Sequence, residues 1–181
     1  MTGGVADIMD SLAAKARAAS RVMASASTER KNAALTKAAA LVRERAGEIL
    51  EINAVDVSAA KSKGQDAAFI DRMELDPGRI EGIAEALENV AALDDPVGKS
   101  ISKWSRPNGL EIERVRTPIG VIAVIYESRP NVTVDAAAIA VKAGNAVILR
   151  GGSECIRTSK ALYDCFRDAL KTAGLPEGAA Q

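Results

Sequence analysis

The residues with the clearest chemical potential follow a strongly apolar stretch, 119–126, and form the segment Glu127-Ser128-Arg129-Pro130-Asn131. Arg129 can pair with a phosphate or a carboxylate, and Asn131 can donate an amide hydrogen bond to a developing oxyanion. A purely structural alternative is that Asn131 caps a following helix while Arg129 pairs with Glu127. The residue types and their spacing favour neither reading over the other.

A second polar segment, Arg150-Gly151-Gly152-Ser153, follows another apolar stretch, 146–149. The two glycines would let a ligand approach the backbone closely, and Arg150 supplies a fixed positive charge suited to a phosphate group. Ser153 can hydrogen-bond a ribose or phosphate oxygen, or it can cap the next helix. Because the G-x-G-x-x-G and P-loop fingerprints are both absent, this segment indicates a phosphate-bearing ligand without naming a reaction.

Several kinds of catalysis are excluded by composition. The sequence contains no histidine and two cysteines, Cys155 and Cys165, so no Ser-His-Asp or Cys-His arrangement can be built within this chain. Acid–base chemistry would need Lys, Glu, Asp, Tyr or Cys. We interpret the cysteines as reduced structural residues, because a helix over 158–171 would hold them about 15 Å apart. Two thiols alone do not favour a tetrahedral zinc site, so no metal site is predicted.

The sequence pattern around the two polar segments predicts the elements that position them, in the order strand, helix, strand and helix. We predict strands over 119–126 and 146–149, and helices over 132–143 and 158–172. Both strands are too apolar for a half-exposed sheet, so the sequence predicts a buried parallel βαβ unit whose two polar segments lie at the same edge. Gly144 is expected to cap the intervening helix at its C-terminus.

The front of the chain, residues 5–93, is helical by pattern, with apolar residues spaced by three and four. Ser27 is a plausible N-cap, and Asp76 followed by Pro77 is a strong start signal. We expect Gly47 to interrupt one helix and Gly64 to end the next. A further short helix is expected over residues 66–72.

Between the helices and the βαβ unit, residues 101–115 alternate in a manner typical of a β-hairpin, with a Pro107-Asn108-Gly109 turn. An isolated two-stranded ribbon is barely stable, so we expect it to rest on another surface such as a second subunit. The predicted division is a helical part over 1–99, a hairpin arm over 100–116 and a partial Rossmann-like segment over 117–181. The fold class is therefore α/β.

Charge and hydropathy argue against two classes of partner. Lys plus Arg and Asp plus Glu both number 24, giving a formal net charge of zero, and no block of like charge stands out. This pattern argues against nucleic acid and anionic membranes as main partners. No apolar run reaches membrane-spanning length, and the N-terminal residues lack the pattern of a secretory signal. We therefore expect a soluble, cytoplasmic protein.

The exact residues of several segments are more informative than their pattern of apolar and polar positions. Three segments resemble the γ-glutamyl phosphate reductase (glutamate-5-semialdehyde dehydrogenase) family, which is the proline-biosynthesis branch of the aldehyde dehydrogenase superfamily. These segments are YESRPNVT, KAGNAVILRGG and AGLPEGA. The same family is also resembled by three further segments, LDPGRI, DDPVG and WSRPNGLEIERVR. The resemblance therefore extends over nearly the whole chain. It implies an incomplete aldehyde dehydrogenase-like fold and a homo-oligomer formed through the hairpin. The implied reaction is NADPH-dependent reduction of L-glutamyl 5-phosphate to glutamate 5-semialdehyde and phosphate, through a thioacyl enzyme and a thiohemiacetal on a cysteine.

The resemblance also implies roles for individual residues. Arg150 stands where the superfamily contacts the adenosine ribose or its 2′-phosphate, and an arginine there favours NADP. Asn131 is the candidate oxyanion donor and Arg129 a candidate substrate contact. The remaining candidate cofactor contacts are Tyr126, Glu127, Ser128, Gly151, Gly152 and Ser153.

The same family has its catalytic cysteine downstream, in a second domain. Neither Cys155 nor Cys165 stands in a comparable motif. We therefore expect this chain to be the N-terminal part of such an enzyme, without its catalytic domain and inactive alone. The alternative hypothesis is a non-catalytic nucleotide-binding or assembly module. The two differ in whether the reading frame continues into a further strand and a cysteine motif.

Overall fold

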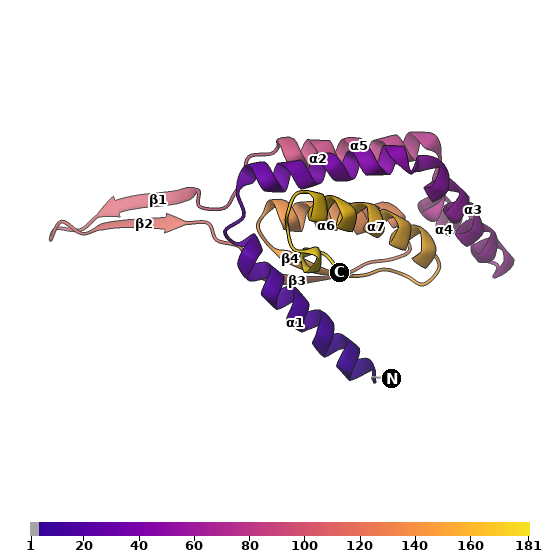
Figure 1. The fold of residues 1–181 in the computed structure, drawn as a ribbon, viewed down its shortest axis with the longest axis horizontal. Coiled ribbons are helices and arrows are strands. Elements are labelled where there is room, and N and C mark those ends of the chain that lie inside the picture. Colours follow the sequence, from indigo (N-terminus) through magenta and orange to yellow (C-terminus); the bar gives the residue numbers. More distant parts are fainter. Residues whose placement is uncertain (1–3) are drawn as a thin grey trace.

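A computed structural model describes residues 4–181, and its elements follow the predicted order of helices, hairpin and α/β unit (Figure 1). No helix among these residues is both long and apolar enough to cross a membrane. The helices are α1 (Val5–Met23), α2 (Thr28–Glu44), α3 (Ala46–Ser62), α4 (Ala67–Met73), α5 (Pro77–Ala92), α6 (Pro130–Lys142), α7 (Ile156–Thr172) and the 3₁₀ turn η1 (Glu177–Ala179). The strands are β1 (Ser100–Ser105), β2 (Glu111–Val115), β3 (Val121–Ile125) and β4 (Ala146–Arg150).

The helix starts are set by local side-chain caps. Ser27 accepts a hydrogen bond from a backbone N–H in the first turn of α2, and Asp66 and Asp76 do the same for α4 and α5. Gly64, at φ +77°, follows the end of α3 as predicted. The predicted break at Gly47 was wrong. The chain bends at Arg45, whose guanidinium lies 2.7 Å from Asp168 of α7, so a tertiary ion pair accompanies the bend.

The elements stack in layers. Helices α2 and α5 lie side by side on the outside, α6 and α7 lie beneath them, and the β3–β4 sheet follows, with α1 on its other face (Figure 1). β3 and β4 are parallel and in register from Val121 opposite Ala146 to Ile125 opposite Arg150. The final residues pair with the free side of β4, where the Gln181 N–H donates to the Val147 carbonyl at 3.0 Å. β4 is thus central.

One strand departs from the prediction. Ala146 and Val147 of β4 are buried as expected, but alternate residues of β3 face outward, with Ile125 79% exposed and Val121 38% exposed. The expectation of two fully buried strands was therefore wrong for β3. The physical reason is that, among the described residues, β3 is an edge strand that pairs with β4 alone, while α6 packs chiefly against β4.

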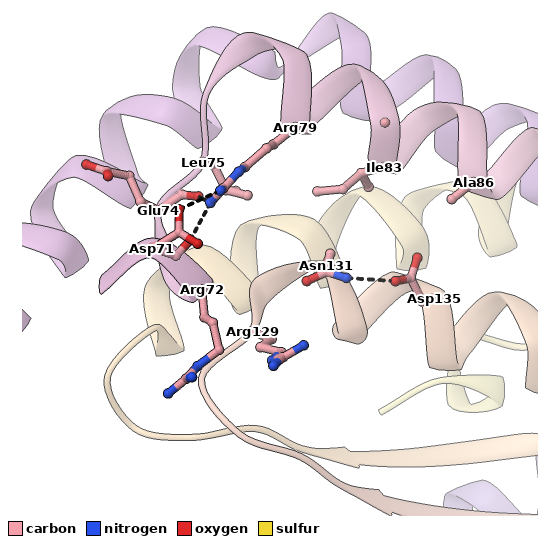
Figure 2. Close-up of a pocket in the computed structure, with 11 residues that line it drawn as sticks. Asp71, Arg72, Glu74, Leu75, Arg79, Ile83, Ala86, Arg129, Asn131 and Asp135 are labelled. Carbon is pink, nitrogen blue, oxygen red and sulfur yellow. Dashed lines mark hydrogen bonds and ion pairs between the residues drawn. The ribbon is translucent and has the colours of Figure 1, made fainter. Parts of the chain in front are cut away.

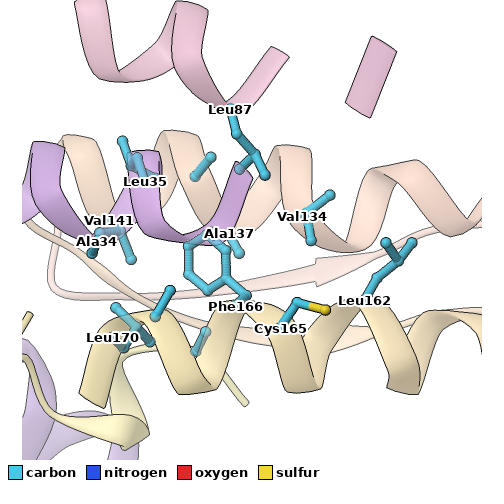
Figure 3. Close-up of a cluster of buried hydrophobic side chains, with 14 of the residues drawn as sticks. Ala34, Leu35, Leu87, Val134, Ala137, Val141, Leu162, Cys165, Phe166 and Leu170 are labelled. Atoms are coloured by element: carbon cyan, nitrogen blue, oxygen red, sulfur yellow. The ribbon is translucent and has the colours of Figure 1, made fainter. Parts of the chain in front are cut away.

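The hydrophobic core surrounds Phe166 of α7, which is 1% exposed and lies among buried side chains of α2 and α6, with Leu87 of α5 in the same cluster (Figure 3). Burying a side chain of this size contributes roughly 1.5–3 kcal/mol to folding. Because α7 packs against both α2 and α6, the core joins the N-terminal helices to the βαβ unit. The labelled neighbours of Phe166 in Figure 3 are Ala34, Leu35, Leu87, Val134, Ala137, Val141, Leu162, Cys165 and Leu170.

A buried carboxylate fixes the start of α7. Asp56 of α3 is 2% exposed, and its Oδ2 accepts hydrogen bonds from the Thr158 N–H at 2.9 Å and from the Thr158 hydroxyl at 2.8 Å. A negative charge at this position interacts favourably with the positive end of the helix dipole. Asn53 extends the contact by donating to the Met73 carbonyl at 2.8 Å. The α3–α4 corner is thereby tied to the helix that follows β4.

A second polar cluster lies at the base of the hairpin. Lys31 of α2 is 1% exposed and forms an ion pair with Asp95. Asp95 also accepts from the Thr28 hydroxyl at 2.7 Å and from the Val97 N–H at 3.0 Å. Burial acts against its charge, but the hydrogen bonds from Lys31 and Thr28 hold the pKa of Asp95 below its usual value. The segment leading into the hairpin is therefore fixed to α2.

The hairpin is a separate two-stranded sheet, as predicted, and projects away from the body of the molecule (Figure 1). The Arg106 N–H donates to the Leu110 carbonyl at 2.8 Å across the turn. Ile101, Trp104 and Val115 are each at least two fifths exposed. That the hairpin rests on another surface remains a prediction.

We predict that Asp56→Ala lowers the free energy of unfolding by about 2–3 kcal/mol, because the buried carboxylate loses its hydrogen bonds from the Thr158 N–H, the Thr158 hydroxyl and the Arg157 guanidinium. Chemical denaturation followed by circular dichroism measures the effect. Glu51→Ala is the matched control, since it removes an exposed carboxylate from the same helix. Equal stability of the two variants would contradict the role given to Asp56.

Candidate functional site

The parallel pairing of β3 and β4 brings the loops that follow them into contact at one edge of the sheet, as the sequence predicts. The Ser128 hydroxyl donates to Oε2 of Glu154 at 2.7 Å, and the Ser153 hydroxyl donates to Oε1 of the same carboxylate at 2.9 Å. The Ser128 hydrogen bond is the largest influence that lowers the pKa of Glu154. Both loops are thus held around one carboxylate that stays negative.

The glycines of the second loop allow this contact. A Cβ at Gly152 would lie 2.1 Å from the Ser128 Oγ, and one at Gly151 would lie 3.0 Å from the Tyr126 ring. Neither glycine has a positive φ, so what is needed is space rather than an unusual backbone conformation. The sequence suggested that they admit a ligand; the geometry gives them a packing role that the sequence did not reveal.

A cleft of about 490 Å³ lies beside these loops, and we call it the Arg150 cleft. It contains predicted cofactor contacts from both loops together with two residues of α4, Phe69 and Arg72, that sequence reasoning missed. The Arg72 guanidinium lies 5.9 Å from the centre of the Phe69 ring, within the range of a cation–π contact. Its lining residues are Phe69, Arg72, Ile125, Tyr126, Glu127, Ser128, Arg150, Gly152 and Glu154.

Arg150 is exposed, and the one side-chain hydrogen bond described for it joins its Nη1 to the neighbouring Gly151 carbonyl at 3.1 Å. Within residues 4–181 no carboxylate forms an ion pair with it, whereas both oxygens of Glu154 are engaged by serines. A guanidinium without a carboxylate partner can donate two parallel hydrogen bonds to a phosphate. Arg150 is therefore available to pair with an anionic group in this cleft.

Arg129 and Asn131 lie elsewhere. They line a second cleft of about 390 Å³ between α4, α5 and the start of α6, which we call the Arg129 cleft (Figure 2). The structural alternative for these two residues was wrong in both parts. Helix α6 begins at Pro130 with Arg129 as its N-cap, so Asn131 lies inside the first turn and donates to Asp135 at 2.9 Å. Arg129 meets Glu127 through a backbone hydrogen bond of 2.7 Å rather than an ion pair.

The helix-cap alternative for Ser153 was also wrong. Helix α7 begins at Ile156, with Cys155 as an N-cap that makes no side-chain capping bond. Asp56 from α3 performs this function instead, as described above. The Ser153 hydroxyl instead donates to Glu154, although Ser153 itself does not line the Arg150 cleft.

Tyr126 is held by its hydroxyl, which lies 2.8 Å from the Thr133 Oγ1. Burial raises the pKa of Tyr126, so the phenol stays neutral near pH 7. Its ring forms one wall of the Arg150 cleft against Gly151.

Both cysteines are free and buried, which confirms their interpretation as structural residues. Burial raises the pKa of Cys155, and it raises the pKa of Cys165 to about 11. The nucleophilic form of cysteine is the thiolate, so neither environment favours nucleophilic chemistry.

Comparison with known proteins gives a consistent result. Residues 2–181 match the aldehyde dehydrogenase family. The chain belongs to this family. Its enzymes are oxidoreductases that use nicotinamide cofactors. γ-Glutamyl phosphate reductase from Rhodospirillum rubrum is 54% identical over 180 residues, a match that covers 99% of this chain and 42% of the relative.

Solved structures give the same fold. The crystal structure of γ-glutamyl phosphate reductase from Thermotoga maritima matches with a TM-score of 0.91 and 44% identity, over 94% of this chain and 41% of that one. The reductase from Saccharomyces cerevisiae matches with a TM-score of 0.90 and 32% identity, over 94% of this chain and 45% of that one. This aldehyde dehydrogenase family chain thus spans about two fifths of the length of the relatives it matches.

We predict that Gly152→Ala separates the two loops, because its new Cβ would overlap the Ser128 hydroxyl. The expected result is a lower melting temperature, with partial recovery in the Gly152→Ala, Ser128→Ala double variant. Recovery is partial because the Ser128 backbone nitrogen would still lie 3.0 Å from the new Cβ.

Gly47→Ala is the control for this series, since a Cβ at that helical position meets nothing within 4 Å. It should be neutral or stabilising by up to about 1 kcal/mol. A Gly152→Ala variant as stable as the Gly47→Ala control would show that the loops tolerate separation.

Proposed function

We propose that this chain forms the N-terminal part of a γ-glutamyl phosphate reductase, which reduces L-glutamyl 5-phosphate to glutamate 5-semialdehyde and phosphate with NADPH in proline biosynthesis. The observation that carries the proposal is 54% identity over 99% of the chain to a reductase of that name. The Arg150 cleft, at the strand edge where open α/β sheets bind nucleotides, agrees with it.

NADP is the proposed cofactor, and it would supply the hydride. Arg150 is proposed to bind the 2′-phosphate, since its guanidinium is exposed and has no carboxylate partner within residues 4–181. Ser128, Gly152 and Ser153 would contact the rest of the nucleotide, together with Tyr126, Glu127 and Gly151. Asn131 remains the candidate oxyanion donor; one N–H of its amide is engaged by Asp135, and the other can still donate.

The nucleophile of the proposed reaction is a cysteine outside these 181 residues. Cys155 and Cys165 are both fully buried, and burial raises the pKa of each thiol. The hairpin is proposed as an assembly arm of a cytoplasmic homo-oligomer, because it projects from the body with apolar side chains exposed (Figure 1).

A chimaeric enzyme tests the proposal. This chain replaces the matching part of the Rhodospirillum rubrum reductase, and NADPH oxidation is measured with L-glutamyl 5-phosphate, or NADP reduction with glutamate 5-semialdehyde and phosphate. The chimaera should turn over, and the 181-residue chain alone should not. A folded but inactive chimaera would refute the proposed function, and turnover by the chain alone would refute a nucleophile outside it.

We further predict that Arg150→Gln in the chimaera raises the KM for NADPH about 10- to 100-fold. The loss of charge-assisted hydrogen bonds worth about 1.5–3 kcal/mol gives this range. The KM for NADH should stay the same, because NADH lacks the 2′-phosphate. Arg21→Gln, which removes an exposed arginine from α1, is the matched control. Equal losses for both nucleotides would place Arg150 away from the 2′-phosphate.

A further inference from the structure

The Arg129 cleft carries two arginines without a carboxylate partner. Within residues 4–181, Arg79 pairs with Asp71 and Glu74 pairs with Lys61, but neither Arg72 nor Arg129 forms an ion pair or a side-chain hydrogen bond. Figure 2 shows both side chains near the start of α6, with their guanidinium groups pointing in different directions. Two guanidinium groups that share a cleft repel each other unless an anion lies between them. The pair therefore indicates a site for an anionic group.

The two arginines are positioned by different elements. Arg129 is the N-cap residue of α6, and Arg72 lies in the last turn of α4, next to the ring of Phe69 at 5.9 Å. The N-terminus of α6 adds the positive end of a helix dipole. Arg72 also lines the Arg150 cleft, so an anion that it binds would lie between the two clefts.

The cleft has an acidic group as well. Asp135 lies on α6, six residues beyond Arg129, or about 9 Å along a helix axis. One of its oxygens accepts from Asn131 at 2.9 Å, and no hydrogen bond is described for the other. Burial raises the pKa of Asp135 because the charged carboxylate is poorly solvated there, and a cation placed beside it would stabilise the charged form. Ile83 and Ala86 of α5 also line the cleft, adding apolar surface.

We propose that Arg72 and Arg129 bind the phosphate of an amino acid with a terminal acyl phosphate, and that Asp135 binds its ammonium group. The inference rests on the proposed function, because L-glutamyl 5-phosphate carries these groups at opposite ends. The phosphate would lie at the end of the Arg129 cleft where Arg72 also lines the Arg150 cleft.

The test is calorimetric titration of the 181-residue chain with L-2-amino-6-phosphonohexanoate, a stable analogue with a phosphonate at one end and an ammonium group at the other. Arg72→Gln and Arg129→Gln should each weaken binding about tenfold or more, as expected for lost charge-assisted hydrogen bonds. Arg129→Lys, which keeps the charge, should weaken binding less. Arg21→Gln, the control already defined, should bind like the unmodified chain.

Asp135→Asn gives an independent readout. It should weaken binding of the amino phosphonate several-fold but leave 6-phosphonohexanoate, which lacks the ammonium group, unaffected. Melting temperatures show that each variant is folded. No binding by the unmodified chain, full binding by both arginine variants, or equal losses in the Arg21→Gln control would overturn the proposal.

This outcome is separable from that of the proposed function. An active chimaera whose Arg72 and Arg129 variants still bind the phosphonate fully would refute the inference alone. Phosphonate binding that depends on the two arginines, in a chain whose chimaera is folded but inactive, would refute the proposed reaction alone.

Discussion

The loops that follow β3 and β4 meet so closely that residue 152 has no room for a side chain beside Ser128. This contact depends on the parallel, in-register pairing of β3 and β4, because both strands then end at the same edge of the sheet. Once the loops meet, Ser128 and Ser153 converge on Glu154, and Tyr126 packs against Gly151. The part of the Arg150 cleft that the two loops form therefore depends on one steric condition at Gly152. A ligand that uses this cleft encounters loops already fixed in position, which lowers the entropic cost of binding.

The helical front of the chain contributes to this arrangement through buried polar contacts. Asp56 reaches across from α3 to the start of α7, and Lys31 holds Asp95 at the base of the hairpin. Lys142 of α6 donates to the Asn32 side chain at 2.6 Å and to the Ala91 carbonyl at 2.8 Å. Burial lowers the pKa of Lys142, and the nearby charge of Lys31 acts in the same direction. Buried charges need specific partners, so these contacts fix how the helices lie on the βαβ unit.

The sequence predicted those features that depend on neighbouring residues. Ser27, Asp66 and Asp76 cap their helices through bonds three residues away, and local patterns therefore located the starts of α2, α4 and α5. It could not predict that α4 would bring Phe69 and Arg72 to loops more than fifty residues later, because that depends on tertiary packing. The bend at Arg45 belongs to the same class, since its ion-pair partner is Asp168.

The separation of Arg129 from Arg150 shows the same limit of sequence-based prediction at the candidate site. Sequence placed both residues at the carboxyl ends of adjacent strands, which is correct for the backbone. The side chains then part, because α6 begins at Pro130 and places Arg129, Asn131 and Asp135 along the cleft beside α5. Arg150 remains at the carboxyl end of β4. The start of one helix thus divides this edge of the sheet into two adjoining clefts, with Arg72 lining both.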